Sequence, residues 1–169
     1  MVTPQLNFKK EQNTIKGALT ESGQSINYKS MVATKDNFVA TIHSAPKVIH
    51  ISCHGIRNEV STMKTSFSSI KEEGNFLLFE TGYGAGELIS SKDLREHVTK
   101  SPHVIDLVFV AACQSEDIGK IFQECGARHV VCVKKTRSVL DDAAIKFTKT
   151  FYSCIFKGFP ICTAFDLAK

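Results

Sequence analysis

VIDLVFVAACQS, residues 104–115, holds the most apolar predicted strand of the 169-residue chain and runs into a cysteine, Cys113. A second apolar run, VIHI at residues 48–51, leads into Ser52-Cys53-His54-Gly55. Uninterrupted apolar strands of this kind are typical of a parallel sheet whose two faces are both covered. The two runs therefore predict parallel strands over 47–53 and 105–112 in an α/β fold.

The rest of the chain alternates helices and strands, as such a fold requires. Apolar residues at helical spacing predict helices over 8–22, 35–44, 91–98, 118–125, 140–156 and 160–168. Further strands are expected over 26–32 and 129–133, and residues 76–89 are expected to form a hairpin. Residues 56–75 are polar with little periodicity and predict a long loop. We see no internal repeat and expect a single domain over 1–169.

The composition is that of an ordinary globular protein, with 43% apolar residues, 22% charged residues and a formal charge of +4. The longest basic cluster, Lys134-Lys135 with Arg137, is too small for a nucleic-acid footprint, so no nucleic-acid partner is expected. No apolar stretch approaches the ~18 residues that span a bilayer, and residues 1–10 lack the apolar centre of a signal peptide. We expect a cytoplasmic protein without a membrane partner, whose cysteines stay reduced.

Cys113 and His54 follow the ends of two different predicted strands. The carboxyl ends of parallel strands share one edge of a sheet, where ligands and chemistry collect, so these two side chains can meet there. A thiol beside an imidazole is the minimal set for covalent acyl transfer, and Gly55 can present an N–H to a developing oxyanion. Taken singly, Cys113 is more simply a buried structural cysteine and His54 a loop histidine. Their joint occurrence at strand ends favours a cysteine peptidase.

Two other groups have simpler explanations. His50, Cys53 and His54 suggest a metal site at first, but on a strand His50 and Cys53 point to opposite faces, and no CxxC pair occurs in the chain. We therefore expect no metal and no other cofactor. The glycine-rich stretch 82–86 lacks the lysine of a phosphate-binding loop and is better explained as a hairpin turn.

Several blocks of sequence occur in an order that is characteristic of one family. They are HISCHG (50–55), Phe79 with GELIS (86–90), VFVAACQS (108–115), GARHVV (126–131), and DAA (142–144) followed by Phe147, Phe151-Tyr152, Gly158 and Ala164-Phe165. From about Leu6 to its end, the chain resembles a CHAT domain, the caspase-like peptidase group related to separase and, more distantly, to caspases. The resemblance implies a caspase-like three-layer α/β/α sandwich with a mainly parallel central sheet. It also implies a His54–Cys113 dyad, with the oxyanion hole formed by the amides of Gly55 and Cys113.

The resemblance also bears on specificity. Caspases recognise an acidic residue partly through a glutamine two positions before the nucleophile, where this chain has Ala111, so aspartate is not the expected residue. The separase-like branch prefers a basic residue, and its pocket acid is most nearly matched by Asp142, with Asp141 beside it. These acids also fit the first turn of a helix with no ligand at all.

The sequence thus predicts a cysteine endopeptidase that hydrolyses a protein or peptide substrate after a basic residue. The alternative is a caspase-like signalling or interaction module that is silent, or active only in a larger multidomain assembly. A small-ligand binder with a flavodoxin-like sheet would leave the paired motifs unexplained.

Overall fold

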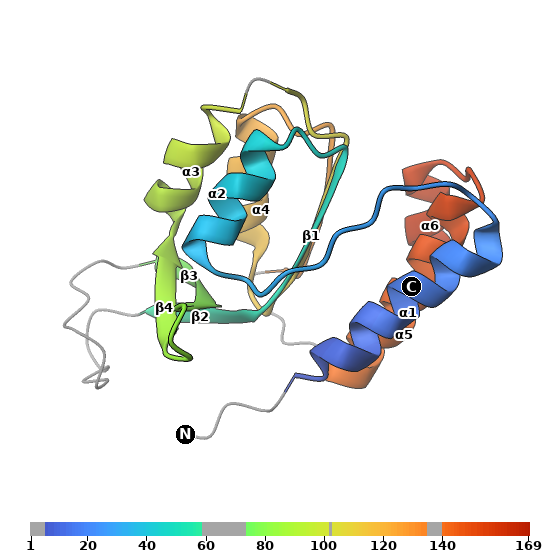
Figure 1. Cartoon of the computed structure of the whole chain (residues 1–169), viewed down its shortest axis with the longest axis horizontal. Coiled ribbons are helices and arrows are strands. Elements are labelled where there is room, and N and C mark those ends of the chain that lie inside the picture. The colour runs from blue at the N-terminus through green and yellow to red at the C-terminus, as the bar shows by residue number, and fades with distance from the viewer. Residues whose placement is uncertain (1–5, 59–73, 102, 135–139) are drawn as a thin grey trace. The chain divides into compact units, whose positions relative to one another are not determined.

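The computed structural model of the chain describes residues 6–58, 74–101, 103–134 and 140–169. Most of the loop predicted over 56–75, and two of the three basic-cluster residues, lie outside the described residues. The chain divides into two compact units (Figure 1). The sheet unit spans Val32–Ser138, and the helical unit combines Met1–Met31 with Val139–Lys169. The single domain expected over the whole chain stays a prediction.

A three-stranded parallel sheet forms the core of the sheet unit. Its strands lie in the order β1 (Val48–Ser52), β5 (Leu107–Ala111), β6 (His129–Cys132). β1 and β5 pair from Val48 opposite Leu107 to Ser52 opposite Ala111, so the two strands end at the same level. The predicted parallel pairing of the two most informative strands is confirmed.

Three helices flank this sheet and supply its apolar core. They are α2 (Lys35–His43), α3 (Ser91–Val98) and α4 (Glu116–Glu124). Alternate strand residues face them, and Val110 of β5 and Phe122 of α4 are fully buried in one cluster. The parallel sheet with flanking helices confirms the predicted α/β class, that of the caspase-like α/β/α sandwich.

A second, antiparallel sheet follows directly after β1 (Figure 1). Its order is β2 (His54–Asn58), β3 (Gly74–Glu80), β4 (Gly86–Ser90), and the predicted hairpin is the β3–β4 pair. The loop predicted from residue 56 onward is wrong for its first residues, which belong to β2. This strand is polar, and it is stabilised by pairing with β3 rather than by an apolar pattern of its own.

The helical unit contains α1 (Phe8–Ser22), α5 (Asp141–Phe156) and α6 (Ile161–Ala168). Phe147 joins α5 to α6, because its ring lies 5.5 Å from that of Phe165 in an edge-on arrangement. All six predicted helices are confirmed to within two residues at each end. In the part of the chain that is described, no helix is both long and apolar enough to cross a membrane.

The strand expected over 26–32 is wrong, because this segment has no regular secondary structure. Ile26 and Val32, which gave it its alternating pattern, are 45% and 55% exposed. A strand needs a partner for its backbone groups, and no strand of the described residues pairs with this segment. It instead links the helical unit to the sheet unit.

Candidate active site

The candidate nucleophile and base lie at the same edge of the parallel sheet. The last residue pair in the β1–β5 register is Ser52 opposite Ala111. His54 and Cys113 each lie two residues beyond this pair, and the Cys53 N–H still donates to the Ala111 carbonyl at 3.4 Å. Both residues therefore emerge from the carboxyl ends of adjacent strands, where α/β proteins collect their chemistry.

Gly55 brings the two motifs into backbone contact. A Cβ atom built on Gly55 would lie 1.8 Å from the carbonyl oxygen of Cys113 and 3.2 Å from its nitrogen. No real side chain fits at such a distance, so only glycine lets β2 pass this close to Cys113. The sequence predicted Gly55 as an oxyanion donor; the structure adds that its backbone lies directly against that of Cys113.

The turn after Cys113 has a left-handed residue at its centre. Gln114 has φ 54°, a region that residues other than glycine adopt only in a few per cent of cases. Ser115 follows and is 1% exposed. Its Oγ donates to the Val110 carbonyl at 3.3 Å and accepts from the Val133 N–H at 3.0 Å. In the sequence Ser115 stands out only as part of the VFVAACQS motif, because its burial and its bond from Val133 depend on the tertiary fold.

Cys113 lies just before the N-terminus of α4, whose first turn carries Glu116 and Asp117. The positive end of a helix favours a thiolate, whereas acids beside it oppose one. Here the acids are engaged: Lys120 lies 3.4 Å from Glu116 and 3.5 Å from Asp117, and the Asn75 amide donates to Asp117 at 2.6 Å. The hydrogen bond with Glu116 raises the pKa of Lys120, so this cation offsets part of the acidic charge.

The remaining cysteines and histidines do not assemble into a metal site. Among the residues that the structure describes, no group of three or more His, Cys, Asp and Glu side chains is arranged to hold a metal ion. His50 stacks on Phe109 of the neighbouring strand, with ring centres 4.7 Å apart. All six cysteines carry free thiols, of which Cys53 is buried, Cys162 is exposed and Cys113 is half-buried.

Asp141 and Asp142 lie in the first turn of α5, in the helical unit, whereas His54, Gly55 and Cys113 belong to the sheet unit. Both acids bind the start of α1: Asp142 accepts from the Lys10 ammonium at 2.7 Å, and Asp141 from the Asn7 N–H at 3.3 Å. Hydrogen bonding and charge attraction from Lys10 lower the pKa of Asp142. The structure thus brings the backbones of Gly55 and Cys113 together and places His54 at the same sheet edge, whereas the catalytic roles of His54 and Cys113 and the substrate-binding role of the two acids stay predictions.

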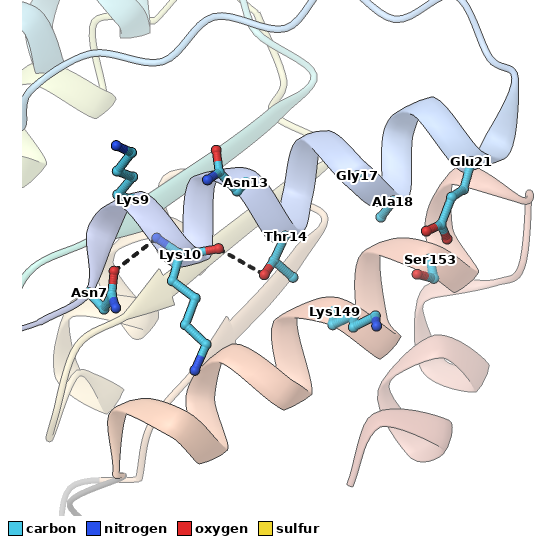
Figure 2. Close-up of a pocket in the computed structure, with 10 residues that line it drawn as sticks. All are labelled: Asn7, Lys9, Lys10, Asn13, Thr14, Gly17, Ala18, Glu21, Lys149 and Ser153. Atoms are coloured by element: carbon cyan, nitrogen blue, oxygen red, sulfur yellow. Dashed lines mark hydrogen bonds between the residues drawn. The ribbon is translucent and has the colours of Figure 1, made fainter.

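An open groove of about 530 Å³ lies along α1 and α5 in the helical unit (Figure 2). Its lining includes Lys9, Lys10 and Lys149 together with small polar side chains, and Figure 2 shows Lys10 directed from α1 toward α5. No cysteine or histidine lines this groove. The candidate covalent chemistry therefore lies outside it, at the sheet edge.

An α/β fold that delivers a His-Gly pair and a cysteine from adjacent parallel strands defines a caspase-like protein. The family model of the CHAT domain matches residues 2–169. The chain therefore belongs to the CHAT domain family, a family of the caspase-like cysteine peptidase type, as its motifs predicted. A comparison with curated proteins finds no significant match.

Proposed function

We propose that this CHAT domain is a cysteine endopeptidase of the caspase-like and separase-like type, with Cys113 as nucleophile and His54 as general acid and base. The observation that supports the proposal most is the contact of the Gly55 backbone with that of Cys113. This contact makes the residue next to His54 a direct neighbour of the nucleophile. A thiol that is half-buried rather than enclosed is also within reach of a substrate.

The chemistry follows from these groups. His54 takes the proton of the Cys113 thiol, and the resulting thiolate attacks the scissile carbonyl, while the N–H groups of Gly55 and Cys113 hold the negative oxygen that forms. His54 gives a proton to the leaving amine, which departs and leaves a thioester on Cys113. His54 then takes a proton from water, whose oxygen attacks the thioester and releases the acid product. The cycle uses no metal and no organic cofactor.

The proposed substrate is a protein or peptide with a basic residue before the cleaved bond. Ala111 replaces the glutamine that helps caspases recognise an acid, and Asp142, with Asp141 beside it, is the proposed acceptor of a basic side chain. The pairing of Asp142 with Lys10 supports its capacity to bind an ammonium or guanidinium group. Six free thiols fit a reducing cytoplasm, which we propose as the compartment.

Substrate preference offers a direct test of the proposed acid. We expect Asp142→Asn to lower the ratio of kcat/KM for an arginyl reporter to that for its uncharged citrulline counterpart by at least about tenfold, because the carboxylate charge is lost. Asp166→Asn is the matched control, since Asp166 is an exposed acid of α6 paired with Lys169. An unchanged ratio in Asp142→Asn would remove Asp142 from the pocket.

Affinity labelling tests the function as a whole. An arginyl chloromethylketone is expected to alkylate Cys113 selectively, with the modified residue identified by mass spectrometry of the digested protein. Iodoacetamide supplies the reference, because it should favour the exposed Cys162. Cys113→Ala should abolish the arginyl labelling, and Cys162→Ser should leave it intact. Labelling that merely follows thiol exposure would contradict the proposal and favour a catalytically silent interaction module within a larger assembly.

A further inference from the structure

We propose that Ser115 is a positioning residue for Cys113. Its buried hydroxyl ties the turn that holds the nucleophile to the ends of strands β5 and β6. This inference rests on the proposed peptidase function. It adds a residue that touches neither the substrate nor the reacting atoms.

The hydrogen bonds of Ser115 join two neighbouring strands. Its Oγ donates to the Val110 carbonyl in β5 and accepts from the N–H of Val133, the residue that follows β6. One hydroxyl thus uses its donor and its acceptor capacity at the same time. Because the side chain is 1% exposed, water is not available to replace either bond if the hydroxyl is removed.

Ordinary helix capping does not explain this serine. Ser115 occupies the N-cap position of α4, where a serine side chain normally accepts from an N–H of the first turn. Here it makes no such bond. The N-cap serine of α3, Ser90, shows the usual pattern, because its side chain accepts from the Asp93 N–H at 3.1 Å. The hydroxyl of Ser115 is directed to the strands instead.

The turn around Gln114 is held from both sides. Its left-handed backbone is unfavourable for a residue with a side chain and persists only where the surroundings determine it. On one side, Gly55 packs against Cys113. On the other side, Ser115 is fixed by its hydroxyl and by its carbonyl, which accepts from the Gly119 N–H at 2.8 Å. Cys113 is therefore placed by Ser115 as well as by β5.

The test compares Ser115→Ala with Ser90→Ala and Ser115→Thr in the full chain. We expect Ser115→Ala to lower kcat for an arginyl reporter by about tenfold or more with KM unchanged, because a loosened turn misplaces the thiol. Ser115→Thr, which keeps the hydroxyl, should recover most of kcat. Ser90→Ala removes a helix cap far along the chain and should lower the melting temperature without lowering kcat.

Hydrogen exchange provides a readout that does not depend on activity: the Val133 amide should lose protection in Ser115→Ala and keep it in Ser90→Ala. If the wild type is active and Ser115→Ala has a normal kcat, the positioning role is overturned while the proposed peptidase function stands. The inference would also be overturned if Ser115→Ala and Ser90→Ala both lost kcat in proportion to their drop in melting temperature. An inactive wild type, with no selective labelling of Cys113, would remove the proposed function and this inference with it.

Discussion

Gly55→Ala is expected to abolish measurable peptidase activity and to destabilise the fold. The new Cβ would lie 1.8 Å from the carbonyl oxygen of Cys113, and that oxygen belongs to backbone that cannot turn aside as a flexible side chain would. Relief of this clash requires β2 to move away from Cys113, the proposed nucleophile. We expect a cost of about 3 kcal/mol in the free energy of unfolding. A displacement of about 1 Å at the dyad should lower kcat/KM at least 100-fold.

The measurements are urea unfolding and cleavage of an arginyl reporter. Gly17→Ala is the matched control, because a Cβ at Gly17, within α1, meets no atom within 4 Å. Alanine is also the better helix former, so this variant should gain up to about 1 kcal/mol and keep full activity. Normal activity in Gly55→Ala would show that His54-Gly55 and Cys113 do not need their close approach.

Cys113→Ala should remove all turnover of the arginyl reporter, because no other group can form the thioester. His54→Ala should lower kcat by about 10²–10⁴-fold, the usual contribution of a general acid and base. Residues that act as one unit show strongly non-additive effects. We therefore expect the double variant to be no worse than Cys113→Ala alone, in a comparison of kcat/KM across the four proteins.

Two control variants replace a histidine and a cysteine that lie away from the proposed dyad. His129 pairs with Leu107 at the opposite end of the parallel sheet, so His129→Ala should keep full activity. Cys125 follows α4, and Cys125→Ala should do the same. Cleavage by Cys113→Ala, with contaminating protease excluded, would refute the dyad.

The sequence was most informative where local pattern and burial coincide. The helices and the parallel strands could be predicted because apolar spacing alone determines which face each buries. β2 could not, because HGIRN at residues 54–58 has no apolar pattern and becomes a strand only by pairing with β3. The strand predicted over 26–32 is wrong for the opposite reason. This segment has the alternating pattern, but among the described residues no strand pairs with it.

In the candidate site, too, the residues visible from local sequence could be predicted, and those that depend on tertiary contacts could not. His54, Gly55 and Cys113 could be selected because residue type and position at a strand end are both visible in the sequence. Ser115 could not be assigned a role, since its burial and its bond from Val133 depend on where β6 lies. For Asp142 the sequence left two explanations open, a substrate-binding acid and an ordinary acid of a first helical turn, and the structure shows this acid in an ion pair with Lys10.

The chain leaves the parallel sheet at Ser52 and enters the antiparallel sheet at His54, with only Cys53 between them. His54 and Cys113, the proposed base and nucleophile, therefore depend on two separate networks of backbone hydrogen bonds. A partly folded chain in which only the parallel sheet has formed holds Cys113 in place but not His54, the proposed base, which is the first residue of β2. Under the proposed function, such a chain has a thiol but no protease, so proteolytic activity begins only once both sheets are complete.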